Sequence, residues 1–409
     1  MMSSPTAVKW QPPAVIALIL LAGILIFSAS TGLWVLTAIP VGFFFGFFLE
    51  KADLCGASAF SEMIMMKDRQ KFWGLCTVIV VSMIGFAVLS ATGLVKLNPK
   101  PLIWANYIVG GIAFGIGIVL AGGCISGCLF KTGQGNLNSM AGLIGIPLGV
   151  AAVAYGPLQG FNNFLKQFII KNTDNSSVTF SSVTGLPYWL LAALFGIAAV
   201  IIAVNLKKKK PAASNVVKKE EMPVLARIMT RPWKPWQAGI AIGVLACFAY
   251  LSSAASGRNY PLGVTKGVLH AQLLITDAPL KHGYAPKNAP PSVQKESSAN
   301  VSNAAKPAKK VSWWLILEVM ALVGGSFTSA KLSNRIKFLP RPPDQTVTAF
   351  FGGILLGAGA AVAGGCVVGN IMSGVALMSV GNVLFLITVV LANWATTWFY
   401  LMGGGFLKS

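Results

Sequence analysis

Acidic residues are scarce in this chain. Only 11 of its 409 residues are Asp or Glu, against 32 Lys or Arg, and charged residues make up 11% of the sequence. A typical soluble domain is about 25% charged. The low charge content, with 55% hydrophobic residues, therefore excludes an ordinary soluble protein. The net charge of +21 is larger than topology-setting loops usually need, which favours an anionic ligand.

Histidine and paired-cysteine motifs are also nearly absent. The chain has two histidines and six cysteines, with no CxxC or HxxxH pair on which a zinc or iron site could be built. The cysteines lie in or beside apolar segments, which argues against a secreted disulfide framework. No Walker-type nucleotide motif is present. We therefore expect no metal, no cofactor, no nucleic-acid partner and no enzymatic activity.

Long apolar runs are abundant, and about nine are long enough to cross ~30 Å of hydrocarbon. We expect an all-α polytopic membrane protein. The predicted spans are 14–30, 72–95, 104–121, 138–157, 186–206, 236–252, 312–330, 346–363 and 381–403. About four pieces are apolar but short or interrupted by Gly and charge, at 33–65, 124–134, 256–278 and 366–378. Such pieces in matching positions of two halves indicate a transporter's binding site.

One 18-residue stretch occurs twice. It reads GGIAFGIGIVLAGGCISG from Gly110 and GGILLGAGAAVAGGCVVG from Gly352, an offset of 242 residues with ten identical positions. The shared positions include a Gly-Gly-Cys triplet, which apolar composition alone would not place in one register. We interpret the two stretches as an internal duplication.

Basic residues predict the topology. A lysine run at 207–210 begins a basic linker, 207–235, which we expect in the cytoplasm. Five predicted spans precede the linker, so the second half, 236–409, would enter the membrane inverted relative to the first, 1–206. The N-terminus is then expected outside and the C-terminus inside a cell inner membrane. The polar segment 279–311 is expected to be a flexible extracytoplasmic loop.

Each Gly-Gly-Cys triplet ends an apolar helix and places a cysteine at the start of the next segment. Glycine at a helix end permits left-handed backbone. The start of a half-helix presents free N–H groups and the positive dipole end, which favour an anion. A thiol is a weak, polarizable partner and suits a soft sulfur-bearing ligand. Cys124 and Cys366 are therefore candidate ligand contacts, although close helix packing would also explain the glycines.

These features together resemble the YeeE/YedE sulphur-transport family. The resemblance rests on Gly-Gly-Cys-x-Ser-Gly at 122–127, its second copy at 364–366, Cys55 placed 69 residues before the first triplet cysteine, and LFKTGQGN from Leu129. It covers both halves of the membrane part. It implies an inverted repeat of spanning helices around short non-spanning ones, and the uptake of inorganic sulfur species such as thiosulfate.

The resemblance also implies residue roles. Cys55, Cys124 and Cys366 would line a central path and pass the anion by S–H···S hydrogen bonds, with a basic outer surface that collects it. The supporting positions would be Gly122, Gly123, Ser126, Gly127, Cys128, Gly364, Gly365 and Gly369. Many relatives have His where this chain has Cys128. Relatives are often encoded with a small cytoplasmic sulfur carrier of the TusA type, which is an expected partner beside membrane lipid.

Other functions stay open at this stage. A branch of the YedE type is proposed to act in selenium metabolism, so a selenium species or another sulfur compound is an alternative substrate. A membrane thiol–disulfide oxidoreductase could use Cys124 and Cys128, because residues four apart share a helix face. A soft-metal carrier could use the methionines clustered at 63–66.

Overall fold

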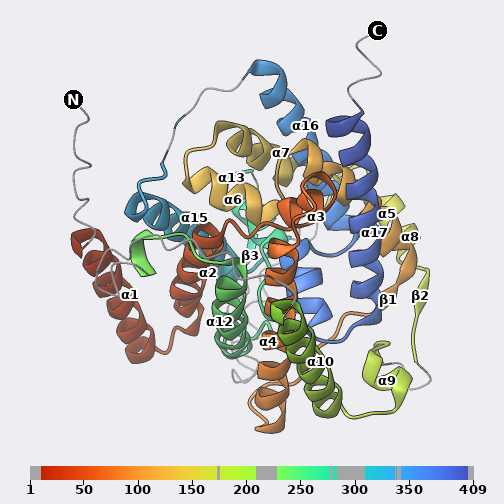
Figure 1. Ribbon diagram of the computed structural model, residues 1–409, viewed down its shortest axis with the longest axis horizontal. Helices are drawn as coiled ribbons and strands as arrows, with labels where there is room; N and C mark the ends of the chain where they lie inside the picture. The colour runs from red at the N-terminus through yellow and green to blue at the C-terminus, as the bar shows by residue number, and fades with distance from the viewer. Residues whose placement is uncertain are drawn as a thin grey trace, which may run out of the picture.

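The computed structural model of this chain consists of helices that stand side by side, with shorter helices between them (Figure 1). It describes residues 11–172, 176–208, 228–276, 280–282, 309–336, 338 and 342–403. Within these ranges the strands form two two-stranded pairings, β1 with β2 and β3 with β4. The protein is thus an all-α, multi-pass membrane protein, as its sequence predicted.

The elements follow one another along the chain with short connections through most of the membrane part. In order they are α1 (Gln11–Thr31), η1 (Trp34–Thr37), α2 (Ala38–Ala52), α3 (Gly56–Met65), α4 (Gln70–Ala91), β1 (Leu102–Ile103), α5 (Trp104–Leu120), α6 (Ile125–Gly133), α7 (Leu137–Ala154), α8 (Gln159–Leu165), β2 (Ile169–Ile170), α9 (Phe180–Thr184), α10 (Tyr188–Lys208), α12 (Pro235–Ala255), α13 (Thr265–Thr276), β3 (Leu280–His282), β4 (Lys309–Val311), α15 (Trp313–Leu332), α16 (Pro343–Val362), η2 (Val367–Val375), α17 (Val380–Thr396) and η3 (Thr397–Met402).

Eight helical stretches of the described chain are long and apolar enough to cross a membrane. Seven of the nine predicted spans fall in them. The other two, 14–30 and 186–206, fall in the shorter apolar helices Val15–Thr31 and Tyr188–Ile202. Of the four pieces predicted to be short, 124–134 is α6, 256–278 contains α13, and 366–378 contains the π-helix η2.

The fourth piece, 33–65, was predicted to be short or interrupted by Gly and charge and was not counted among the nine spans. It contains α2, which is continuous for 15 residues, followed closely by α3, and together they form a candidate span. Glu50 and Lys51 do not break α2, because both are fully buried and bonded to neighbouring elements. The placement of the N-terminus outside and the C-terminus inside the membrane stays a prediction.

Helices of the first half pack against helices of the second. α2 packs on α15 and α12 on α4, while α16 packs on both α7 and α5 and α17 packs on α5. Glycine makes these crossings close. A Cβ at Gly325 of α15 would collide with the Phe43 carbonyl of α2, and one at Gly359 of α16 with the backbone of Phe114 in α5. The two halves thus pack against each other, and the inverted repeat and the division into 1–206 and 236–409 stay predictions.

Two predicted segments lie largely outside the described residues: the linker 207–235 and the loop 279–311. At the end of the linker, Trp233 stacks on Phe48 of α2 with ring centroids 5.4 Å apart. At the ends of the loop, β3 and β4 pair in parallel.

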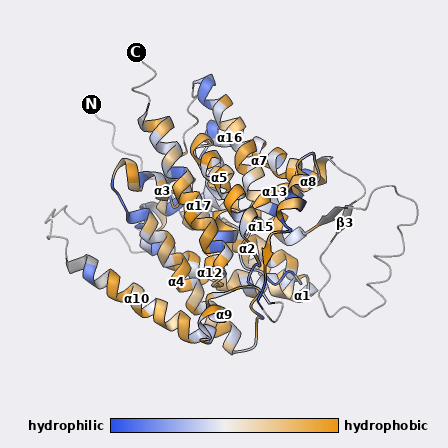
Figure 2. Ribbon diagram, turned by 90° about the vertical axis from the view of Figure 1, so that its right-hand side faces the viewer, coloured by the Kyte–Doolittle hydropathy of each residue, from blue (hydrophilic) through white to orange (hydrophobic). Residues whose placement is uncertain are grey.

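Apolar side chains cover the outer faces of the peripheral helices. Ile26 of α1 and Phe399 of η3 are each 70% exposed, and α4 and α10 carry apolar residues along their length (Figure 2). A soluble protein rarely exposes so wide an apolar surface. This is the surface that lipid covers.

Candidate functional site

Three buried cysteines each begin a short helix. Cys55 is the N-cap of α3, Cys124 of α6 and Cys366 of η2. All three have extended backbone and fully buried side chains. Because the first backbone N–H groups of a helix lack partners within it, the three thiols lie at positive dipole ends. The sequence-based placement of Cys124 and Cys366 at the start of a new segment is confirmed.

Left-handed residues turn the chain into these helices. Gly122 has φ +67° and Gly364 has φ +70°, and a Cβ would meet nothing within 4 Å at either position. Glycine is therefore required there by backbone conformation and not by crowding. Before Cys55 the same conformation is adopted by Asp53, with φ 46°. The turn before Cys55 thus has the same backbone conformation as the turns before Cys124 and Cys366, but it contains no glycine pair. No repeated sequence motif therefore marks it.

Two of the three cysteines touch. The Sγ atoms of Cys55 and Cys124 are 3.6 Å apart, and the Cys124 Sγ is also 3.3 Å from the Oγ of Ser126. Gly127 lies against this contact, because a Cβ there would collide with the Cys55 Sγ. The recorded sulfur partner of Cys124 is therefore Cys55 and not Cys128, the partner that the oxidoreductase hypothesis required.

The third cysteine, Cys366, begins a helix whose start contacts the start of α3. A Cβ on Gly56, next to Cys55, would come within 2.7 Å of the Val367 side chain, next to Cys366. The start of α3 and the start of η2 therefore abut. Cys366 also interacts electrostatically with Lys100 on one side and with Cys124 on the other.

At each Gly-Gly-Cys triplet a lysine donates a hydrogen bond to the carbonyl of the first glycine; we call the turn at this glycine the corner. Lys131 Nζ donates to the Gly122 carbonyl at 2.8 Å, and Lys100 Nζ donates to the Gly364 carbonyl at 2.8 Å and to Asn370 Oδ1 at 2.6 Å. Positions 131 and 100 are not related by the 242-residue offset. The two lysines therefore make equivalent bonds although they do not occupy matching positions of the repeat. A comparison of the two repeat copies could not have identified them.

Lys100, Arg258 and Lys266 line a cavity of about 340 Å³, which we call the basic mouth. Its wall also includes Gly364, Gly365 and Gly369, three of the predicted supporting positions. Arg258 lies over the rings of Trp314 and Tyr260, at 4.9 and 5.7 Å from their centroids. Tyr260 donates to the Gly369 carbonyl at 2.6 Å, which fixes the wall beside η2.

The polar groups of the basic mouth are incompletely paired. Removal from water lowers the pKa of Lys100 to about 7, and repulsion from Lys266 acts in the same direction. Burial likewise lowers the pKa of Lys266. Thr265, at the start of α13, is 6% exposed, and its Oγ1 has no hydrogen-bond partner among the described residues. An anion in this cavity would meet two ammonium groups, a guanidinium and a free hydroxyl.

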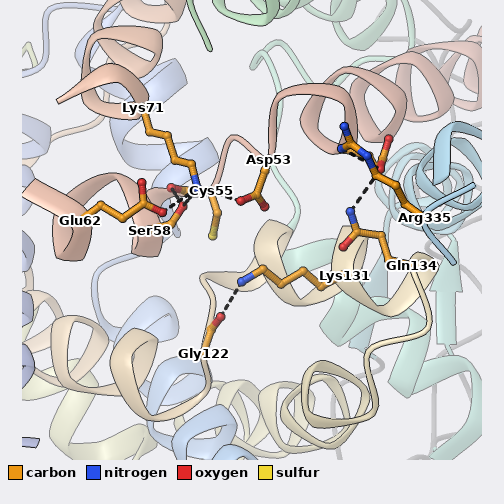
Figure 3. A network of polar contacts seen from close by, with 10 residues as sticks. Asp53, Cys55, Ser58, Glu62, Lys71, Gly122, Lys131, Gln134 and Arg335 are labelled. Carbon is orange, nitrogen blue, oxygen red and sulfur yellow. Dashed lines mark hydrogen bonds and ion pairs between the residues drawn. The ribbon is translucent and has the colours of Figure 1, made fainter. Parts of the chain in front are cut away.

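Near Cys55, one cation is paired with two carboxylates. Lys71 Nζ lies 2.7 Å from Asp53 Oδ2 and 2.6 Å from Glu62 Oε1, and it donates to the Ser58 Oγ at 3.3 Å (Figure 3). We call Asp53, Glu62 and Lys71 the acidic mouth. The Cys55 side chain lies between this group and Lys131 (Figure 3).

A buried carboxylate ties the helices beside the acidic mouth together. Glu50 of α2 is fully buried and accepts from Ser329 of α15 and, at 3.3 Å, from Gln134 at the end of α6. Arg335 Nη1 is 3.6 Å from Glu50 Oε1. The charges before Cys55 are therefore paired, as the cost of charge in a bilayer demands.

The chain is similar to known membrane transporters. A model of the family described as sulphur transport matches residues 51–395. A thiosulfate transporter TsuA from Spirochaeta thermophila is 28% identical over 372 residues, which cover 88% of this chain and 98% of that protein. A thiosulfate transporter TsuA from Escherichia coli K12 is 26% identical over 366 residues, or 89% of this chain and 94% of that one. A probable transporter YedE from the same bacterium is 33% identical over 148 residues, about a third of each chain. Because the family model spans both halves of the membrane part, the chain belongs to the sulphur transport (YeeE/YedE) family.

Proposed function

We propose that this protein moves thiosulfate, or a similar soft inorganic sulfur anion, across the membrane along a path lined by cysteines. The anion enters at the basic mouth, passes Cys366, Cys124 and Cys55, and leaves at the acidic mouth. The observation that carries the proposal is the 3.6 Å contact between the Cys55 and Cys124 sulfurs at two helix starts. At this contact, two fully buried thiols can donate S–H hydrogen bonds to the anion, and their polarizable sulfur atoms can contact its terminal sulfur.

The chemistry of the path favours a soft anion. A thiol donates weakly and its sulfur is polarizable, so it interacts better with a terminal sulfur atom than with a strongly hydrated oxyanion. The starts of α3, α6 and η2 supply the positive ends of three helix dipoles and spare backbone N–H groups. These fixed dipoles offset the loss of water without binding the anion as tightly as a buried cation would. A sulfate ion lacks the terminal sulfur and would be discriminated against.

The basic mouth supports the choice of an anion at the loading end. Its three cations line the cavity at Lys100, Arg258 and Lys266, and the Thr265 hydroxyl is free to donate. Electrostatic focusing into a concave site raises the local concentration of an anionic substrate. We place this mouth on the outer face of a cell inner membrane, where an anion that is taken up would first meet the protein.

A small cytoplasmic sulfur carrier of the TusA type is the partner that would receive the anion at the acidic mouth. Two of the named relatives are thiosulfate transporters, which supports a sulfur anion as cargo. Selenium species are a second class of cargo, because selenium is at least as polarizable as sulfur and would meet the same thiols.

The test is growth and uptake in a bacterial strain that lacks its own thiosulfate uptake. The full chain should restore growth on thiosulfate as sole sulfur source, and Cys55→Ala, Cys124→Ala and Cys366→Ala should each abolish uptake of radiolabelled thiosulfate. Cys76→Ala and Cys247→Ala are matched controls, because both thiols are half-buried within α4 and α12 and away from the three helix starts.

The result separates three possibilities. Loss in the three path variants with retention in both controls supports the path. Full uptake in Cys124→Ala would overturn it. If the unchanged chain reaches the membrane but does not take up thiosulfate, the cargo is wrong, and selenite, selenosulfate and other sulfur oxyanions are compared next.

A further inference from the structure

The two mouths of the path differ in how their cations are neutralised. The residues that line the basic mouth include two lysines and an arginine, and none of them is an Asp or Glu. The recorded carboxylate beside that cavity is Glu318, which is fully buried and accepts from the Gly263 N–H at 3.4 Å. At the acidic mouth one lysine, Lys71, contacts two carboxylates directly.

The carboxylates of the acidic mouth belong to the chain segments on either side of Cys55. Asp53 lies two residues before it in the left-handed corner, and Glu62 lies on α3, which Cys55 begins. Their side chains are 48% and 24% exposed, whereas the Cys55 side chain is fully buried. Lys71 comes from α4 and bonds to both segments. An anion that leaves Cys55 toward solvent therefore meets a lysine whose charge is already neutralised by the Asp53 and Glu62 carboxylates.

We propose that Asp53 and Glu62 set the release step, by neutralising Lys71 so that the departing anion is not retained beside Cys55. This inference rests on the proposed function and adds a role for two acidic residues to it. A path with cations at both ends would bind its anion at both ends, and the second site would slow release. Here the loading end is left cationic, while the release end carries more carboxylates than its bonded lysine can neutralise. The charge difference lets the anion bind well on one side and leave readily on the other.

Lys131 also faces this end, and it donates to the Gly122 carbonyl. A carbonyl does not cancel its charge, so Lys131 remains as a single cation that draws the anion from Cys124 toward Cys55. The carboxylates of Asp53 and Glu62 then oppose longer retention. Release is thus balanced between Lys131 and these two acids.

The experiment uses the purified full chain in proteoliposomes, with initial rates of radiolabelled thiosulfate uptake measured over a range of thiosulfate concentrations. Asp53→Asn and Glu62→Gln keep the shape and a carbonyl acceptor for Lys71 while they remove the charge. Tighter binding at the release end should lower both Vmax and KM, by about two- to five-fold for each variant, with Vmax/KM nearly unchanged. The effect should shrink at high ionic strength, because these side chains are partly exposed.

Asp68→Asn is the matched control, because Asp68 is a nearby acid whose Oδ1 accepts from the Gln70 N–H and does not contact Lys71. It should leave both constants unchanged. In a Lys71→Gln background, Asp53→Asn should no longer lower KM, since the cation that it unmasks is gone. Thermal unfolding of each variant shows whether the fold is kept.

The outcomes are distinguishable from failure of the proposed function. If the unchanged chain does not transport thiosulfate, the proposed function fails first. If it transports but Asp53→Asn and Glu62→Gln lower Vmax with KM unchanged, the acids only hold the Cys55 corner in place and the inference is wrong. A rise in Vmax/KM would place the acidic mouth at the loading end and also overturn it.

Discussion

Cys128 and Asn370 occupy matching positions in the duplicated stretch and make the same hydrogen bond. Each lies four residues after the cysteine of its copy, and each donates to the carbonyl of the glycine that precedes that cysteine. The Cys128 Sγ is 3.7 Å from the Gly123 oxygen, and the Asn370 Nδ2 is 3.0 Å from the Gly365 oxygen. The thiol of Cys128 therefore does a task that an amide does in the other half, which is to fix the corner.

Cys128 should accordingly tolerate replacement by another donor. We expect Cys128→Ser to retain most thiosulfate uptake, because a hydroxyl can donate to the Gly123 carbonyl as the thiol does. Cys124→Ser is the comparison, and it should lose uptake because a hydroxyl is a poor partner for sulfur. Initial uptake rates in cells with equal amounts of membrane protein decide the point. Equal loss in both variants would make Cys128 a member of the path.

Lys100 should make loading depend on external pH. Burial lowers its pKa to about 7, below the usual value for lysine, so its charged form is lost as pH rises through that range. An anion needs the charged form, and KM should therefore rise by about tenfold between pH 6 and pH 8. Lys100→Arg should flatten this profile, because arginine stays charged. Uptake kinetics at several external pH values test this, and identical profiles for both proteins would exclude Lys100 as the titrating group.

Removal of the Lys100 charge should weaken loading at every pH. Lys100→Met is expected to raise KM by about tenfold, the usual effect of losing one hydrogen bond to a charged group. Lys96→Met is the control, because Lys96 is exposed and lies outside the residues that line the cavity. An unchanged KM in Lys100→Met would mean that the anion binds elsewhere.

Gly324 and Gly325 offer a paired test of the crossing between α15 and α2. A Cβ at Gly325 would collide with the Phe43 carbonyl, whereas one at Gly324 would meet nothing within 4 Å. Gly325→Ala should destabilise the protein by about 1–3 kcal/mol, the typical cost of overpacking. Gly324→Ala should leave stability unchanged or raise it slightly, because alanine favours helix. Thermal unfolding in detergent compares the two, and equal stability would contradict the close crossing.

The buried carboxylate of Glu50 should matter more for stability than an exposed acid. Glu50→Ala leaves the Gln134 amide, the Ser329 hydroxyl and the Arg335 guanidinium without their acceptor. We expect a loss of about 3 kcal/mol, since removal of one member of a buried charged group leaves the others unpaired. Asp344→Ala, in the first turn of α16, is the control, and it should cost less than about 1 kcal/mol through the helix dipole. Similar unfolding temperatures would show that the Glu50 group adds no stability.

Local pattern predicted much of this fold, and long-range pairing explains what it missed. Apolar length found seven of the candidate spans, and the Gly-Gly-Cys triplets indicated where two short helices begin. The span formed by α2 and α3 was not among the nine predicted ones, because Glu50 and Lys51 look like helix breakers in a local window. Their partners include Ser329 and Ser333, which lie 279 and 282 residues further along. No local reading of sequence can supply such partners.

The cysteines of the candidate site could be named from the sequence, whereas its charged residues could not. Cys55, Cys124 and Cys366 were found from the duplication and from family resemblance. The cations of the basic mouth come from two separate connections and the start of α13, so no motif unites them. The third corner escaped notice because Asp53, and not glycine, adopts the left-handed conformation there.

The span of the Glu50 pairing has a consequence for how the protein is made. The hydroxyl that Glu50 binds belongs to a residue 279 positions later, so it is synthesised roughly 15 to 55 seconds after Glu50 at ordinary rates of translation. During that interval the Glu50 carboxylate of α2 lacks one of its hydrogen-bond partners. The bond that joins α2 to α15 at Glu50 can therefore form only after α15 has been synthesised.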